Sequence, residues 1–484
     1  MMLGESKFVT NGVPVLVGAA LGVVVANLIM DGDWHLALIV VFSLPAFVLI
    51  HRYPFISILI WFLLTSFLMV TPSMPSRMLY WFIHRALPPA TVIVIVVSSL
   101  LRVNQRKLPR LGWPEFAMAG YVLVSSISIF LLNEYPRATM ILFYDRVISP
   151  MCLYLIVRFT YPSEKDLSRL VPIAFFLAVS QSVIGLLSWF APSVLPSAWL
   201  THEGLRSTGS LGNPSVYSAT LMFSCLILLQ AALSRKSGMV KNIYLPVCLL
   251  ALFGVFFSFS RASWLGGLLV IIGLVFLYPR DLLRFSFIAL PVFVLLIGGG
   301  LLSSELQWAR QRLYSEQSEG SALSRLPVYM AAYRMFESKP FFGWGYGNFD
   351  RYDRQFQERV ADLVNPGKDH ASHNVYLTIL AEQGLIGFTL FLAPLFWWLI
   401  SSLRPSARME PEGFLGTKFR MMLWLFILFY ITLNNFSNIK VVFGLGLYWI
   451  TLALIANMIQ PDHPAVDHRK PENNGFDFSQ YYRS

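Results

Sequence analysis

Residues 373–400 read HNVYLTILAEQGLIGFTLFLAPLFWWLI, a stretch in which Glu382 is the one carboxylate and no lysine or arginine occurs. About 20 mostly apolar residues in a helix are enough to cross the roughly 30 Å hydrocarbon core of a bilayer. Similar runs recur along the whole chain of 484 residues, of which 56% are hydrophobic and 13% are charged. Because a soluble domain does not need so much apolar surface, we expect an all-α, polytopic transmembrane helical bundle.

The apolar runs predict about 12–14 membrane spans joined by mostly short connections. The first run is too closely followed by the second, and too poor in small residues at a cleavage site, to be a cleaved signal peptide. We therefore interpret it as a helix that is retained. The expected spans are 12–30, 34–50, 54–71, 87–101, 112–132, 140–157, 168–190, 214–234, 242–259, 263–279, 283–302, 373–400, 419–437 and 441–459.

The same runs divide the chain into four parts. We expect N-terminal transmembrane helices over residues 1–200 and a functional core over residues 201–400, which includes a long polar loop at 303–372. C-terminal transmembrane helices follow at 401–460. The remaining residues 461–484 are polar enough to predict a disordered tail.

Lysine and arginine gather on alternate connections, which orients the chain because cytoplasmic loops retain most basic residues. With the N-terminus inside, the basic connections 102–110, 158–169, 235–241 and 404–420 all fall on the cytoplasmic side. The long loop 303–372 then lies outside. The net charge of +11 thus reflects topology and attraction to membrane lipids, and it does not indicate nucleic-acid binding.

Basic residues on the outer side are exceptions to this pattern. The connection HEGLRSTGSLGNPS, residues 202–215, carries Arg206, and the short turn SFSRASW, residues 258–264, carries Arg261. An arginine near hydrocarbon is costly unless something compensates it. Arg261 either extends to the lipid headgroups or belongs to an anion-binding site.

The segment SRLPVYMAAYRMFESKPFFGWGYGNF, residues 324–349, adds Arg325 and Arg334. Its apolar residues recur at helical spacing, which predicts an interfacial helix that ends near Pro340. The glycines that follow predict a tight turn, with a phosphate-binding loop as the alternative. The apolar positions are Val328, Ala332, Met335 and Phe336, and the glycines are Gly343, Gly345 and Gly347.

His370 and His373 stand where the polar loop meets the span 373–400. Two histidines at this spacing share a helix face, but no third ligand accompanies them, so we expect no metal. A neutral imidazole at the membrane interface can instead accept a proton near pH 7. Glu382 lies on the opposite face of that helix and is expected to pair with another helix.

Four further charged residues allow two interpretations each. Asp31 and Asp33 follow the first span, where a solvated turn is expected and a catalytic or metal-binding role is the alternative. Asp145 and Arg146 lie within the sixth span, where we expect an internal polar pair and keep a functional role as the alternative.

Taken together, HASHNVYLTILAEQGLIG, SFSRASW, RSTGSLGNPSVYS and the segment 324–349 resemble the O-antigen ligase and polymerase superfamily of bacterial envelope glycosyltransferases. The resemblance covers about residues 200 to 400. It implies that Arg206, Arg261 and Arg325 bind the donor diphosphate and that His373 is the catalytic base. His370, Asn374, Arg334 and Glu382 are accessory candidates.

The resemblance also implies an activity. Such an enzyme transfers a glycan from undecaprenyl diphosphate to an acceptor hydroxyl at the periplasmic face of the bacterial inner membrane, with inversion and without a metal or other cofactor. The acceptor is lipid A-core in a ligase, which we favour, or a second carrier-linked glycan in a polymerase. A secondary transporter is the more distant alternative, because the chain lacks matched broken helices in two halves.

Overall fold

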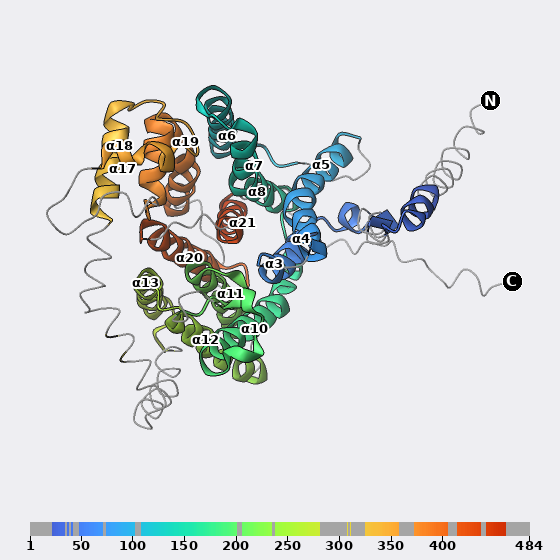
Figure 1. The fold of residues 1–484 in the computed structure, drawn as a ribbon. Coiled ribbons are helices and arrows are strands. Elements are labelled where there is room, and N and C mark those ends of the chain that lie inside the picture. The colour runs from blue at the N-terminus through green and yellow to red at the C-terminus, as the bar shows by residue number, and fades with distance from the viewer. Residues whose placement is uncertain are drawn as a thin grey trace.

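The computed structural model describes most of the chain between residues 22 and 460, and within that part it contains helices and no strand (Figure 1). This confirms the all-α prediction. His370, most of the loop 303–372 and the tail 461–484 lie outside the described residues. The described residues are 22–33, 36–37, 40–41, 48–70, 74–101, 108–200, 206–234, 238–280, 307, 310, 325–357, 372–404, 414–436 and 442–460.

The elements follow one another with short connections. The labelled α-helices and π-helical turns, with three 3₁₀ turns, are α3 (Ile56–Leu68), α4 (Met74–Trp81), η1 (Phe82–Ala86), α5 (Leu87–Leu100), α6 (Trp113–Leu132), α7 (Pro136–Phe143), η2 (Tyr144–Ile148), α8 (Ser149–Thr160), α9 (Glu164–Ser168), α10 (Leu170–Phe190), η3 (Pro192–Val194), η4 (Ser197–Trp199), η5 (Gly209–Leu211), α11 (Pro214–Ser234), α12 (Gly238–Phe257), α13 (Arg261–Leu277), α17 (Leu326–Ser338), α18 (Phe349–Phe356), α19 (Val375–Leu403), α20 (Thr417–Phe436) and α21 (Val442–Ile459).

Eight continuous helices in the described part are long and apolar enough to cross a membrane. The predicted spans 112–132, 214–234 and 441–459 agree with them to within one residue. Shorter apolar helices correspond to the predicted spans 54–71, 242–259 and 263–279. The eight are Ser76–Leu100, Trp113–Leu132, Pro136–Thr160, Glu164–Phe190, Pro214–Ser234, Val375–Leu403, Thr417–Phe436 and Val442–Ile459.

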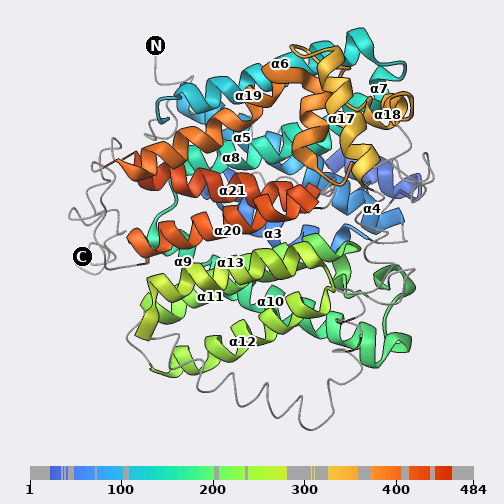
Figure 2. The same cartoon turned by 90° about the vertical axis from the view of Figure 1, so that its left-hand side faces the viewer.

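Two helices form the centre of the bundle. Of the most apolar stretch of each, 94% of the residues are buried in α11 and 89% in α21. α21 packs against α8 and α20, whereas α11 packs against α10 and α12 (Figure 2). Small residues permit this close packing: a side chain at Gly446 of α21 would come within 2.1 Å of the Trp61 ring.

Prolines mark two irregular places in long helices. The predicted span 87–101 begins earlier than expected, at Ser76, because a π-helical turn, η1, carries the helix up to Pro88 and Pro89. η2 does the same before Pro150. Proline has no N–H and clashes with the carbonyl of the preceding turn, and the wider π-turn accommodates it.

The helix α19 is broken at Gly384, whose φ of 61° and ψ of −165° are accessible essentially to glycine alone. The break leaves backbone groups of α19 without helical partners. The segment after α17 supplies them. Trp344 and Gly345 donate N–H groups to the carbonyls of Ala381 and Glu382 at 3.1 and 2.7 Å.

The pairing continues on the other side of the break. Leu385 donates its N–H to the carbonyl of Pro340 at 2.7 Å, and Ile386 donates to that of Phe341 at 3.2 Å. Within a membrane protein, irregular backbone is tolerated where it is buried in protein and its polar groups are satisfied. The segment 340–345 therefore completes α19.

The expected glycine turn is confirmed, since Gly343, Gly345 and Gly347 all have positive φ. Its N–H groups do not form an open cradle for phosphate. Besides the bonds to α19, the N–H of Tyr346 donates to the Ser128 Oγ of α6 at 3.2 Å. The turn is thus fixed between α19 and α6.

α17 has the predicted amphipathic pattern. Val328, Ala332 and Met335 are buried in a small cluster with Phe349 of α18 and Ala381 of α19. Its apolar stripe therefore faces protein. Phe341, just after α17, remains 61% exposed and is available to the membrane interface. In Figure 2, α17 and α18 lie together at one end of the bundle, which we call the α17 end.

At the opposite end, Arg158 departs from the prediction that it is a loop residue. Its side chain is fully buried in α8 and bonds to the Glu115 carboxylate at 3.1 Å. Asn457 and Gln460 accept its other N–H groups at 2.7 and 2.6 Å. A buried charge needs such complete pairing. Arg158 therefore links α6, α8 and α21.

We expect Gly384→Ala to destabilise the protein. The new Cβ would lie 2.4 Å from the backbone carbonyl atoms of Phe341, and the strained backbone conformation alone costs about 1–3 kcal/mol. Thermal unfolding of the purified protein should show a lower Tm. Gly267→Ala is the matched control, because its Cβ would find only ordinary contacts, the nearest at 3.8 Å. An unchanged Tm for Gly384→Ala would contradict the need for the break.

Candidate functional site

The sequence element at the start of α19 has two different parts. Asn374 is the N-cap: its Oδ1 accepts the N–H groups of Tyr376 and Leu377 at 3.0 and 3.1 Å. This satisfies two of the donors that every helix start leaves unpaired. Asn374 therefore begins the helix, and its accessory role in the site is to fix the position of the preceding residue.

His373 precedes this cap and does not belong to the helix. Its φ of 49° places it in the left-handed region, which few residues other than glycine adopt. The side chain is half-buried. The expectation that His373 shares a helix face with His370 fails on its side, and His370 lies outside the described residues. The held backbone, rather than a helix, fixes this histidine.

The C-terminal end of α20 connects several elements of the site. Arg325, the residue before α17, donates from Nη1 to the carbonyl of Phe436, the last residue of α20, at 3.1 Å. Asn434, half a turn earlier, interacts through its side chain with the hydroxyl of Tyr376. The start of α17, the start of α19 and the end of α20 therefore meet at the α17 end.

Arg261 reaches the same end through α13. This helix runs antiparallel to α20, because Gly266 lies against Phe429 and Gly273 against Leu425. The first residue of α13, Arg261, is therefore level with the last turn of α20. A positive side chain at a helix N-terminus is unfavourable for the helix itself, whereas an anion there is favourable. The position suits a residue whose purpose is to bind an anion.

Arg206 is linked to the turn that leads into α13. The neighbouring Ser207 donates its N–H to the carbonyl of Phe257, the last residue of α12, at 3.0 Å. Its hydroxyl donates to the carbonyl of Gly185 at 2.7 Å. The structure therefore collects the two arginine-bearing connections beside each other, at the end of the bundle that also carries Arg325 and His373.

Two accessory candidates stabilise α18. Arg334 donates to the carbonyl of Phe356, the last residue of α18, at 3.5 Å. Glu382 is buried, and its Oε1 accepts the N–H of Phe349, the first residue of α18, at 3.0 Å. A carboxylate at a helix N-terminus and a guanidinium at its C-terminus both complement the helix dipole. The expected pairing of Glu382 with another helix is confirmed.

Asp145 and Arg146 do not pair with each other as expected. The π-turn η2 directs Asp145 to Arg85 of η1, whose Nε and Nη2 bind both carboxylate oxygens at 2.7 and 2.6 Å. Arg146 instead forms a hydrogen bond with the hydroxyl of Tyr346. Burial raises the pKa of Tyr346, and the positive charge of Arg146 opposes that shift.

Arg146 and Tyr346 were missed because neither residue stands out locally. Arg146 was considered only as a partner of Asp145, and Tyr346 stands among the glycines of the turn. The one available signal was the charge itself, since an ionisable residue inside a span is a candidate for function.

The remaining acidic candidates form a turn. Asp31 and Asp33 follow the helix at residues 22–30, with Gly32 between them at a φ of 82°. Among the residues that the structure describes, no group of three histidine, cysteine or acidic side chains is arranged to hold a metal ion.

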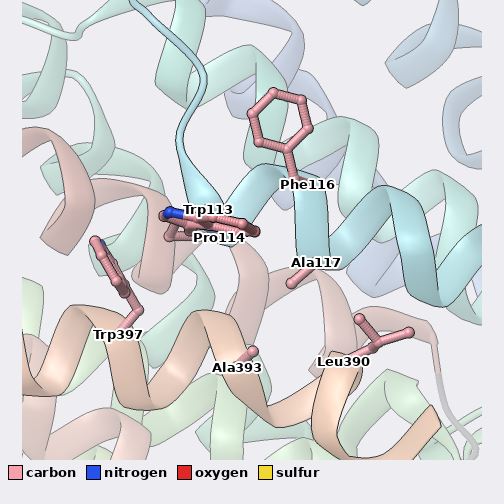
Figure 3. Close-up of a pocket in the computed structure, with 7 residues that line it drawn as sticks. All are labelled: Trp113, Pro114, Phe116, Ala117, Leu390, Ala393 and Trp397. Carbon is pink, nitrogen blue, oxygen red and sulfur yellow. The ribbon is translucent and has the colours of Figure 1, made fainter. Parts of the chain in front are cut away.

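A pocket of about 410 Å³ lies far along α19 from His373, against the start of α6 (Figure 3). Figure 3 shows the rings of Trp113 and Trp397 at one side of it. Its lining carries no titratable group, so it offers no chemistry for group transfer. The lining residues are Trp113, Pro114, Phe116, Ala117, Leu390, Ala393 and Trp397.

Comparison with known families identifies part of this arrangement. Residues 246–392 match the family model described as O-antigen ligase. The matched segment contains Arg261, Arg325, His373 and Glu382, and it ends within α19. No curated protein matches the chain. The match confirms the resemblance to the O-antigen ligase and polymerase superfamily.

Proposed function

Because residues 246–392 carry an O-antigen ligase domain, we propose that this protein is an inner-membrane glycosyltransferase. It takes a glycan from undecaprenyl diphosphate and transfers it to an acceptor hydroxyl of lipid A-core at the periplasmic face. The observation that supports this proposal best is the meeting of Arg325, the start of α19 and the end of α20 at the α17 end.

The arginines supply the electrostatic part of the mechanism. As the bond between the anomeric carbon and the diphosphate oxygen breaks, the leaving diphosphate keeps the electron pair and gains negative charge. Arg206, Arg261 and Arg325 remain charged at any physiological pH and can each bind two oxygens. Fixed positive groups that face developing charge lower the barrier of the step. They perform the role that a divalent cation has in other phosphate chemistry.

The histidine supplies the proton transfer. The acceptor hydroxyl attacks the anomeric carbon from the side opposite the diphosphate, and His373 takes the hydroxyl proton. One displacement of this kind inverts the anomeric centre. The products are the glycosylated acceptor, undecaprenyl diphosphate and a protonated histidine, which returns its proton to water.

A transporter is less consistent with the arrangement of α19. Broken helices in transporters direct unpaired backbone groups at a substrate or ion. Here the carbonyls of Ala381 and Glu382 and the N–H groups of Leu385 and Ile386 are all bonded to the segment 340–345. The break therefore positions protein segments and leaves those groups unavailable to an ion.

We expect Arg206→Lys and Arg261→Lys to lose most of the transfer activity. Lysine keeps the charge but cannot bind two diphosphate oxygens in a planar fork. Transfer from carrier-linked glycan should be measured with purified protein at matched protein levels. Arg334→Lys is the control, since Arg334 holds α18. Full activity in both test variants would mean that these arginines only reach for lipid headgroups.

We expect His373→Ala to lower the transfer rate by about 10²–10⁴-fold, the typical contribution of a positioned base. Binding of the carrier-linked donor should change little, because the arginines hold the diphosphate. His370→Ala should have a much smaller effect. The assay should be repeated with EDTA. A normal rate for His373→Ala, or a wild-type enzyme stopped by EDTA, would refute the mechanism.

The ligase assignment predicts the phenotype of a deletion strain. Without a ligase, finished polymer stays on its carrier, and the lipopolysaccharide on a gel lacks O-antigen. Without a polymerase, lipid A-core instead receives single repeat units. We expect the first pattern, with restoration by the wild-type gene and not by the His373→Ala variant. Single repeats on lipid A-core would identify the protein as a polymerase.

A further inference from the structure

A second cavity, of about 220 Å³, lies beside the first turns of α19. It is separate from the apolar pocket between α6 and α19. Its walls come from α6, α7, η2, the glycine turn, α18, α19 and α21. The lining residues are Tyr121, Thr139, Leu142, Arg146, Val147, Tyr346, Gly347, Phe349, Asp350, Val375, Thr378, Ile379, Glu382, Phe391 and Leu445.

The cavity carries charges of both signs. Arg146 faces it from η2, whereas Asp350 and Glu382 face it from α18 and α19. One guanidinium against two carboxylates does not favour a diphosphate, whose own charge the carboxylates would repel. The lining therefore differs in kind from the end of α20, where the arginines gather.

The rest of the lining suits a ligand that is rich in hydroxyl groups. Arg146 can donate hydrogen bonds, carboxylate oxygens accept them, and the hydroxyls of Tyr346, Thr139 and Thr378 can do both. The same cavity is bordered by aromatic rings, which can pack against the apolar face of a sugar ring. These rings belong to Tyr121, Tyr346, Phe349 and Phe391.

The size of the cavity limits the ligand. Pockets that enclose a whole drug-sized molecule measure about 300–1,000 Å³, and this cavity is smaller at about 220 Å³. It fits one sugar ring rather than an oligosaccharide. The remainder of a glycan would have to extend outside it.

The position of the cavity distinguishes donor from acceptor. Its walls lie on the side of α19 that packs against α6 and α18, whereas α20 and α13 lie on the other side (Figure 1). His373 precedes the helix turn that carries Val375 and Thr378 of the cavity wall. In a displacement with inversion, the attacking hydroxyl and the leaving diphosphate stand on opposite sides of the anomeric carbon. The arginines occupy one side, so the cavity is placed for the attacking group.

We propose that this cavity binds the sugar ring that carries the acceptor hydroxyl. The inference rests on the proposed transferase function and adds the acceptor subsite to it. Arg146, Tyr346 and Asp350 orient the ring, and the glycan or lipid beyond it extends out of the cavity. The same chemistry fits a terminal sugar of lipid A-core and a sugar of a carrier-linked repeat unit.

Leu142→Trp tests the subsite by filling it. Leu142 lines the cavity from α7 and is 46% exposed, so a larger ring there should not disturb the core. We expect the KM for the acceptor to rise at least tenfold while the KM for the donor stays unchanged. Ile141→Trp is the matched control, since Ile141 is the preceding residue, is 52% exposed and does not line the cavity.

Arg146→Gln is the second test and changes charge rather than volume. Loss of a hydrogen bond from a charged group should weaken acceptor binding by about tenfold or more. Binding of purified lipid A-core to the protein, measured without donor, gives a readout that does not depend on turnover. The same measurement with a carrier-linked repeat unit shows which source supplies the sugar.

The outcomes separate the subsite from the proposed function. A raised KM for the donor, or acceptor binding unchanged in both Leu142→Trp and Arg146→Gln, would overturn the acceptor subsite while transfer by the wild type continues. Failure of the wild type to transfer glycan to either acceptor would instead refute the proposed function.

Discussion

The break of α19 at Gly384 is the constraint on which the α17 end depends. A helix interrupted inside a bundle must find partners for the backbone groups it releases, because no water replaces them there. Four hydrogen bonds from the segment 340–345 meet that need. They also determine where the chain goes next, since α18 starts within a few residues of the glycine turn. The amide at the start of α18 is then bonded to the carboxylate of Glu382, just before the break.

This arrangement explains why glycine is required on both sides of the contact. A Cβ at Gly343 would lie 2.4 Å from the backbone of Glu382, and one at Gly384 would lie equally close to the backbone of Phe341. Two main chains can approach to hydrogen-bonding distance here only if neither residue has a side chain. A sequence feature that resembles a phosphate-binding loop is therefore a backbone joint. The joint holds the cavity wall and the start of α19 in one rigid unit.

Local sequence was sufficient for most of the helices and for part of the site. Hydropathy is a local property, so the bounds of α6, α11 and α21 could be predicted closely. The charge rule identified Arg206 and Arg261 because each is an exception that can be recognised without a structure. The pattern of α17 predicted its buried residues correctly. Arg158 was misassigned because the same rule counts a basic residue at a helix end as a loop residue, whatever it binds.

Long-range pairing could not be predicted in the same way. The partner of Asp145 is Arg85, 60 residues earlier, and nothing in either neighbourhood indicates it. The π-turns separate the directions of Asp145 and Arg146, an effect that regular helical spacing does not contain. The contact between Arg146 and Tyr346 joins segments about 200 residues apart. Such contacts depend on which helices become neighbours, and that depends on the packing of the whole bundle.

The two ends of the bundle use buried charge for different purposes. Arg158 is enclosed by α6, α8 and α21, and Glu115, Asn457 and Gln460 accept hydrogen bonds from its guanidinium. Such a group stabilises helix contacts and has no surface left for a substrate. Arg146, by contrast, lies in the wall of a cavity and shares it with Asp350 and Glu382. Charged groups beside a cavity can exchange hydrogen bonds with a ligand, which groups enclosed by protein cannot do. The difference in surroundings, rather than in residue type, is what assigns binding to the α17 end and structure to the other.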